Sequence, residues 1–167
     1  MGRPHPNADA SARRLAESLD DVEDEVIAEY GADSMRLYEL FMGPLEKGAP
    51  WSTEGIPGCF RFLQRTYRLI VDEDSEGEPL RELAEGDGTP AQARLTARTI
   101  DGVTRDLERT QPNTAISKLM VWSRDITEDG PLPRKGAEAF LLMLSPFAPH
   151  LAEELWSRIG HQSSLAY

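Results

Sequence analysis

The sequence has few of the residues that crosslink a chain or hold a metal ion. Cys59 is the only cysteine among 167 residues, which excludes an internal disulfide and a zinc site built on cysteines. The three histidines complete no set with the spacing of metal ligands. Because no partner for a nucleophile accompanies it, Cys59 is predicted to be a small buried residue on a helix.

Long apolar segments are also missing. No apolar run approaches the roughly 20 residues that a membrane-spanning helix needs, and no signal-peptide pattern opens the chain. We therefore expect a cytoplasmic protein without membrane contact. With 167 residues, 40% of them apolar, the chain is long enough to bury a core and suits a globular fold rather than a disordered one.

The sequence offers no group of residues typical of a catalytic centre. It has no Gly-rich phosphate loop and no plausible pair of nucleophile and base. Adjacent acids such as Glu153 and Glu154 point about 100° apart on a helix, so they suit solubility or helix ends better than general acid–base chemistry. We predict no catalytic residue and no metal site, and we expect the chain alone to be inactive.

Basic residues are fewer than acidic ones, and the formal net charge is −11. Nucleic-acid binders usually carry positive charge that attracts phosphates. The acidity is local, however: residues 20–33 hold seven acids and no base, and residues 72–88 hold eight acids with Arg81 as the one base. These two segments carry −14, which leaves +3 for the rest. The net charge therefore does not exclude RNA as a partner.

The apolar pattern predicts an all-α fold. Few segments alternate with a period of two, so almost no sheet is expected, and helices should begin near Glu54, Pro90, Pro112 and Pro149. We predict an antiparallel bundle of five or six helices. Its expected organisation is an irregular tail over residues 1–21, connecting helices over 22–53, and a bundle over 54–167 that contains an acidic linker at 72–89.

The helical period also predicts which side of each helix is buried. The residues expected to face the core are Phe60, Leu63, Tyr67 and Ile70 in the first bundle helix, Leu95, Ile100, Val103 and Leu107 in the second, and Ile116, Leu119, Met120 and Ile126 in the third. Trp122 is expected at the edge of the core. His150, which has no acid nearby in the sequence, is interpreted as a structural histidine.

The segment from Tyr30 to Glu46, YGADSMRLYELFMGPLE, is apolar nearly all round a helix axis. Gly31 is suited to end an incoming helix with a positive φ, and Asp33 or Ser34 is suited to cap the next one. A short helix of this kind must be buried on several sides, so the other helices are expected to pack around it.

This segment resembles the one that follows the KMSKS loop in bacterial leucyl-tRNA synthetases. Three later segments resemble the same family in the same order: EGIPGCFRFLQRTYRLIVD, TIDGVTRDLERTQPNTAISKLM and RKGAEAFLLMLSPFAPHLAEELWSRIG. The resemblance covers most of residues 22–167. It implies the C-terminal, anticodon-binding-type helical bundle of class Ia synthetases.

The resemblance also implies a function. The parent family is a leucine–tRNA ligase that attaches leucine to tRNA(Leu) at the expense of ATP, with ATP and Mg²⁺ bound in a catalytic domain upstream of this bundle. The present chain has neither a HIGH motif nor a KMSKS loop, so no cofactor is expected here. Its expected partners are tRNA(Leu) and the upstream catalytic domain, and its expected role is to dock the body of the tRNA.

Two rows of arginines are the candidate tRNA-binding residues. Arginine binds phosphate oxygens in a bidentate manner, and successive helical turns follow a nucleic-acid backbone. Each row is expected opposite the buried side of its helix. A helix surface that only faces solvent would carry arginines in the same pattern, so this alternative stays open. Trp51 is a further candidate that either packs on the bundle or stacks on a nucleotide. The candidates are Arg61, Arg65, Arg68, Arg94, Arg98, Arg105, Arg109 and Trp51.

An alternative function comes from a different class. A detached bundle of this family would serve as a protein–protein interaction module that no longer binds RNA. The missing KMSKS loop, the two acidic segments and the unfamiliar first 20 residues favour this alternative.

Overall fold

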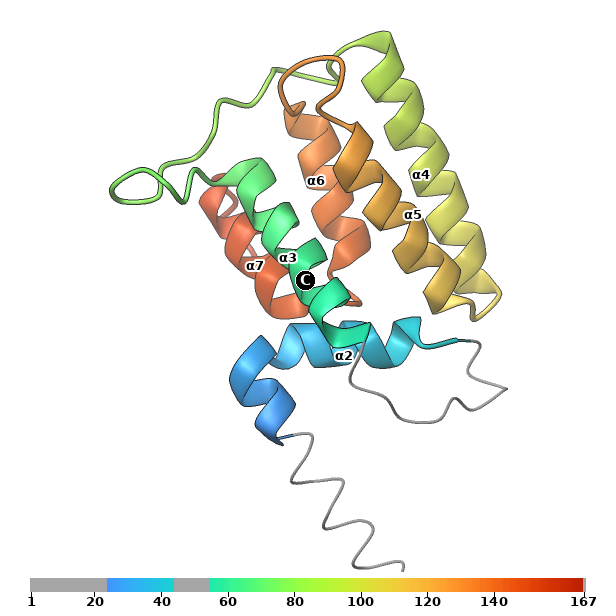
Figure 1. Ribbon diagram of the computed structural model, residues 1–167. Coiled ribbons are helices and arrows are strands. Elements are labelled where there is room, and N and C mark those ends of the chain that lie inside the picture. Colours follow the sequence, from blue (N-terminus) through green and yellow to red (C-terminus); the bar gives the residue numbers. More distant parts are fainter. Residues whose placement is uncertain (1–23, 44–54, 167) are drawn as a thin grey trace, which may run out of the picture.

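The computed structural model describes residues 24–43 and 55–166. Residues 24–30 are helical and lead into α2 (Ala32–Phe41), which is followed by α3 (Ile56–Ile70), α4 (Pro90–Glu108), α5 (Pro112–Asp125), α6 (Arg134–Leu144) and α7 (Pro149–Arg158). Helices α3 to α7 run alternately up and down, and α2 lies across one end of them (Figure 1). The described residues form isolated β-bridges but no strand, so the all-α prediction is confirmed.

Prolines and polar caps start the helices at the predicted places. Pro90, Pro112 and Pro149 each occupy the first position of a helix, where a missing N–H costs nothing. At α4 the Thr89 hydroxyl accepts from the Gln92 amide, and the Gln92 side chain accepts from the Thr89 amide. This capping box satisfies two backbone donors of the first turn.

Helix α2 is enclosed as predicted. Met35, Leu37 and Tyr38 are buried, and the helix packs against α3, α5 and α7. The exposed Arg36 donates to the carbonyl of Pro146 from both Nε and Nη2, at 3.1 and 3.0 Å. This helix thereby ties the start of the described chain to the turn between α6 and α7.

The acid on α2 caps a different helix from the one expected. Neither Asp33 nor Ser34 caps α2, which begins after Gly31 with φ +82°. The Asp33 carboxylate instead accepts from the amides of His150 (3.3 Å) and Leu151 (2.7 Å) at the start of α7, and lies 2.8 Å from His150 Nδ1. His150 therefore does have an acid beside it, which the sequence could not indicate because the two residues are 117 positions apart.

The prediction that Trp122 lies at the core edge was wrong. Its side chain is 1% exposed and stacks on Phe140 with ring centroids 4.4 Å apart. The indole nitrogen donates to the Thr96 hydroxyl at 3.0 Å, which satisfies its one polar atom in the interior. Trp122 therefore joins α4, α5 and α6 at the centre of the bundle.

The predicted inner side of α4 was also wrong for most of its residues. Val103 is buried, but Ile100 and Leu107 are 42% and 41% exposed, and Leu95 is half-buried. The residues that α4 buries are Gln92, Thr99, Gly102, Val103 and Asp106. Most are small or polar and find specific partners, so the apolar period does not mark the inner side. In α3, Leu63 and Ile70 are buried as predicted, whereas Phe60 and Tyr67 are half-buried.

Gln92 illustrates how a buried polar residue holds two parts of the chain together. Its side-chain amide donates to the carbonyls of Ile126 (2.8 Å) and Pro131 (3.0 Å) in the turn between α5 and α6. The same side chain completes the cap of α4. None of the helices in the described residues is long and apolar enough to cross a bilayer.

Candidate functional site

The arginines of α3 lie on its exposed side, as predicted. Arg61 and Arg65 are exposed, and neither forms an ion pair with a described residue. Arg68, one turn further on, pairs with Glu73 in the acidic segment that follows the helix. Two of the three guanidinium groups in this row therefore keep their charge available for an outside ligand.

The arginines of α4 show the same division. Arg94, Arg98 and Arg109 are exposed and form no ion pair with a described residue. Arg105 pairs with Asp101, which lies four residues before it on the same helix. The remaining described arginines are engaged elsewhere: Arg36 with a backbone carbonyl, and Arg81, Arg124, Arg134 and Arg158 with nearby acids.

The row on α4 does not stand opposite the buried side of the helix. Arg98 lines a groove between α4 and α5 with a volume of about 400 Å³, together with Thr99, Thr114, Ser117, Lys118 and Val121. The buried side of α4 is turned from its predicted position because Gly102 and Asp106 face α5. Within this row, Arg98 therefore borders α5.

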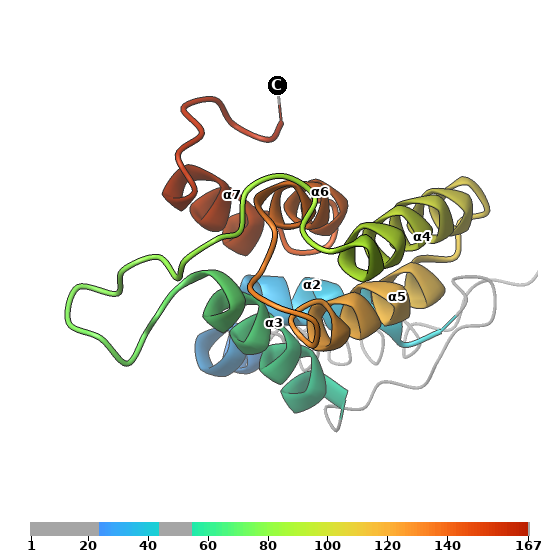
Figure 2. The ribbon, with the colours of Figure 1, turned by 90° about the horizontal axis from the view of Figure 1, so that it is seen from above.

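Helix α5 separates the two arginine-bearing helices. It packs against both α3 and α4, and Figures 1 and 2 show it lying between them. The two helices that carry the arginine rows thus flank α5. We call the exposed arginines of these helices, Arg61, Arg65, Arg94, Arg98 and Arg109, together with the α4–α5 groove, the basic face.

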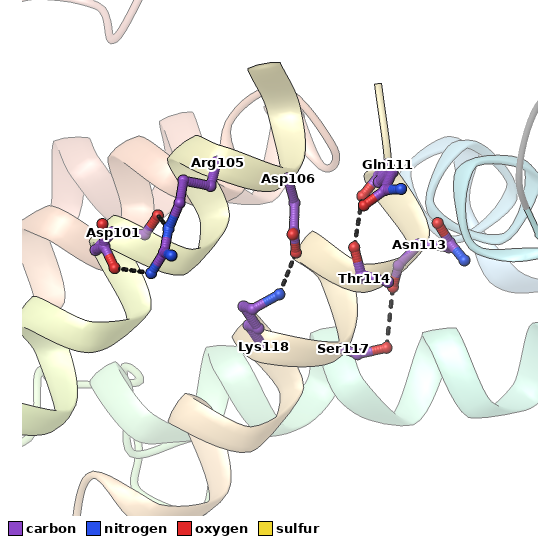
Figure 3. A network of polar contacts seen from close by, with 8 residues as sticks. All are labelled: Asp101, Arg105, Asp106, Gln111, Asn113, Thr114, Ser117 and Lys118. Atoms are coloured by element: carbon purple, nitrogen blue, oxygen red, sulfur yellow. Dashed lines mark hydrogen bonds and ion pairs between the residues drawn. The ribbon is translucent and has the colours of Figure 1, made fainter. Parts of the chain in front are cut away.

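The α4–α5 groove contains a basic residue that sequence reasoning missed. The side chain of Lys118 lies across Gly102, where an added Cβ would stand 2.7 Å from its Cδ. Its ammonium group donates to the carboxylate of Asp106 (Figure 3). The signal available in the sequence was Gly102, a glycine inside a helix, which marks a close approach by another chain segment.

Asp106 holds this end of the groove together. Burial, the largest influence, raises the pKa of its carboxyl group, but hydrogen bonds from Lys118 and Thr114 and the charges of Lys118 and Arg109 together hold the pKa below its usual value. Its backbone carbonyl also accepts from the Gln111 amide at 2.8 Å. The carboxylate is therefore ionised and fixes Lys118 in the groove.

Two hydroxyl groups line the groove next to Lys118. Ser117 Oγ donates to the Asn113 carbonyl at 2.9 Å, and Thr114 Oγ1 donates to the Gln111 carbonyl at 3.1 Å (Figure 3). Trp51, the remaining candidate from the sequence, lies outside the described residues. Within the parts of the chain that the structure describes, no group of acids, histidines or cysteines could hold a metal ion.

Comparison with known proteins agrees with the resemblance. Residues 93–167 match the family model described as the anticodon-binding domain of tRNA ligase. The chain is 46% identical over 145 residues to leucine–tRNA ligase of Streptomyces coelicolor and 48% identical over 144 residues to that of Salinispora tropica. Each alignment covers 86% of this chain but 15% of the relative.

A solved structure is similar in both fold and sequence. It is a ternary complex of the Agrobacterium radiobacter K84 agnB2 LeuRS with tRNA and LeuAMS. The TM-score is 0.67 at 27% identity, over 86% of this chain and 20% of the solved one. The present chain thus spans about a sixth of the length of the curated relatives it matches.

Proposed function

The chain belongs to the anticodon-binding domain family of tRNA ligases, as a homologue of leucine–tRNA ligases, and from this premise we propose that it binds tRNA(Leu) through the basic face. The contacts are mainly to backbone phosphates. In the parent protein, which attaches leucine to tRNA with ATP, this bundle holds the body of the tRNA so that the 3′ end reaches a catalytic domain outside the present chain.

The observation that carries the proposal is the division of the arginines. Five exposed guanidinium groups on α3 and α4 form no ion pair with a described residue, whereas most other described arginines do. A guanidinium group that is already paired has part of its charge and some of its donors taken up by an acid. An unpaired one gains charge-assisted hydrogen bonds at once and releases counterions from the nucleic acid. The basic face is therefore the part of the surface best suited to a polyanion.

The form of the face also suits a phosphate backbone better than base edges. Arginines on successive turns of a helix repeat at about 5.4 Å, and α3 and α4, which carry the two rows, lie on either side of α5. The described residues place no exposed aromatic platform beside these rows on which a base would stack. Recognition by shape and backbone is typical of proteins that bind the folded body of an RNA.

The experiment that tests the proposal compares two double variants with a matched control. Arg61→Gln with Arg65→Gln, and Arg94→Gln with Arg98→Gln, each remove two unpaired charges. The control is Arg124→Gln with Arg158→Gln, which removes two charges that are already paired with acids. Binding of a leucine tRNA transcript is measured by fluorescence anisotropy between about 50 and 200 mM salt.

Loss of two phosphate contacts lowers the slope of log K against log salt by roughly 1.4 to 1.8. We expect this change in both test variants, with unaltered melting temperatures, and at most a small change in the control. Equal effects in control and test variants would show that overall charge, not the basic face, determines binding.

The alternative function, a protein-interaction module, is favoured by one observation on a different surface. Leu142 is 53% exposed, and beside α6 a groove is lined by apolar Ala97, Ile100 and Ala139. Isolated apolar side chains are normal, but neighbouring ones often mark an interface. This alternative predicts that a fully folded chain has no measurable affinity for tRNA even at about 50 mM salt.

A further inference from the structure

We propose that the α4–α5 groove binds one stretch of RNA backbone, with a phosphate at Arg98 and Lys118 and a ribose 2′-hydroxyl at Ser117. The inference rests on the proposed function and deepens it: it adds two residues of α5 to the binding surface and gives that surface a preference for RNA over DNA. The groove has a volume of about 400 Å³ and opens between two helices of the basic face.

The two cations supply more hydrogen-bond donors than the protein uses. An ammonium group has three N–H donors, and among the described residues Lys118 donates to Asp106 alone. The guanidinium group of Arg98 has five, and it forms no ion pair with a described residue, although Asp125, Glu128 and Asp129 line a neighbouring pocket with it. The side chain of Lys118 is 40% exposed, so its remaining donors are accessible. A phosphate provides further acceptor oxygens for the donors that remain.

The position of Lys118 is built into the packing of the two helices. Its stem lies over Gly102, with an added Cβ meeting both Cδ at 2.7 Å and Cε at 2.9 Å. Arg98, Gly102 and Asp106 follow one another at intervals of four residues, so they share one side of α4 on successive turns. Lys118 therefore enters the groove one turn away from Arg98, with Asp106 holding its far end.

The hydroxyl group of Ser117 is arranged to accept rather than to donate. A serine or threonine hydroxyl has one proton and two acceptor lone pairs. The proton of Ser117 is directed to the backbone carbonyl of Asn113, which leaves the lone pairs of its oxygen for an outside donor, whereas the Thr114 hydroxyl is already engaged by the Gln111 carbonyl and the Asp106 carboxylate. A phosphate diester has no proton to donate, whereas a ribose 2′-hydroxyl has one. The groove thus matches a phosphate at its cations and a 2′-hydroxyl at its acceptors, and a deoxyribose cannot satisfy the second part.

The test measures binding of the 167-residue chain to a leucine tRNA transcript and to a DNA molecule of the same sequence. The variants are Ser117→Ala, which removes an acceptor, and Lys118→Met, which removes the charge and keeps the stem over Gly102. Thr104→Ala is the matched control, because Thr104 is an exposed hydroxyl of α4 that does not line the groove.

Each variant is expected to change a different quantity. Ser117→Ala should reduce the RNA-over-DNA affinity ratio by about 3- to 10-fold, the value of one hydrogen bond, without changing the salt slope. Lys118→Met should weaken RNA and DNA binding alike and lower the salt slope by about one. Thr104→Ala should change neither quantity.

A purely structural role for Lys118 gives a different pattern. Lys118→Met would then lower the melting temperature and leave the salt slope of the folded chain unchanged, and this result would overturn the inference. Lys118→Met leaves the buried carboxylate of Asp106 without its partner, which itself can destabilise the fold. The double variant Lys118→Met with Asp106→Asn removes that carboxylate as well, so the salt slope of RNA binding can be measured on a folded chain. If RNA binding depends on Arg61 and Arg65 but not on the groove variants, the inference fails and the proposed function stands. If the unmodified chain binds no tRNA, both fail.

Discussion

Replacing Asp33 with alanine should destabilise the protein by removing a helix cap that comes from another helix. The first position of α7 is Pro149, which has no N–H, and no side chain within α7 caps its first turn. The next two amides, those of His150 and Leu151, both donate to the Asp33 carboxylate. The capping group therefore depends on the contact between α2 and α7.

The expected magnitude follows from two contributions. Loss of an N-terminal cap costs about 1 kcal/mol, within a range of roughly 0.5–2 kcal/mol. Loss of a negative charge at the positive end of the helix dipole costs roughly 0.3–1 kcal/mol, towards the upper value because the Asp33 side chain is 12% exposed. Asp33→Ala should therefore lower the free energy of unfolding by about 2 kcal/mol. For a chain of this length the melting temperature should fall by roughly 4–8 °C.

Two further variants separate the cap from general charge effects. Asp33→Asn keeps a hydrogen-bond acceptor and loses the charge, so about half of the effect should remain. Glu39→Ala, the control, removes an exposed acid of α2 that bonds to no described residue, and it should change stability by less than about 0.5 kcal/mol. The measurement is chemical denaturation followed by far-UV circular dichroism. An Asp33→Ala variant no less stable than Glu39→Ala would refute the reasoning, since it would show that water replaces the carboxylate at no cost.

Three other results are expected. Gln92→Leu should lower the free energy of unfolding by about 2–4 kcal/mol in urea denaturation, because it leaves the buried carbonyl of Ile126 without a donor and breaks the cap of α4; a loss below 1 kcal/mol would contradict this. The pKa of Asp106 is lowered in the folded state, so its contribution to stability is present above the unfolded pKa of about 3.9 and is lost as the pH falls through the lower folded value. Asp106→Asn should therefore make the decline in stability at acid pH less steep. If the melting temperature of Asp106→Asn falls with decreasing pH as steeply as that of the unmodified chain, the prediction is contradicted. Burial raises the pKa of the Cys59 thiol to about 11, so at pH 8 about one molecule in a thousand carries the thiolate. Iodoacetamide should therefore label the native chain far more slowly than the urea-unfolded chain, and equal labelling rates would contradict a buried thiol.

The sequence predicted those features that depend on neighbouring residues. The starts of α4, α5 and α7 follow from proline and capping residues within one turn of each helix end, and all three were correct. The break after Leu144 follows equally from Ser145 and Pro146. Signals of this kind are local, so a single sequence contains them in full.

The features that were missed depend on partners far along the chain. The inner side of α4 was mispredicted because an apolar period treats Gln92 and Asp106 as surface residues, whereas their partners, Ile126 and Lys118, lie 34 and 12 positions away. The cap of α7 by Asp33 spans 118 positions. For the site, the sequence identified the type and spacing of the arginines. It could not show which of them are neutralised by acids, nor that Lys118 joins them.

The arrangement of ion pairs explains how a chain with a net charge of −11 presents a surface suited to RNA. The acids of the segment after α3 pair with bases close to them: Glu73 with Arg68, Asp72 with Arg81, and Glu78 with Arg158. Salt screens exposed charges beyond about 8–10 Å, so unpaired acids in this segment act mainly on their own surroundings. Arg61 and Arg65, earlier on α3 than Arg68, keep charges that no described acid neutralises. Replacing the acids after α3 would therefore release Arg68 and add a charge to the basic face. In the α4–α5 groove, by contrast, the one buried acid of the described residues, Asp106, positions Lys118 and leaves most of the donors of its ammonium group accessible.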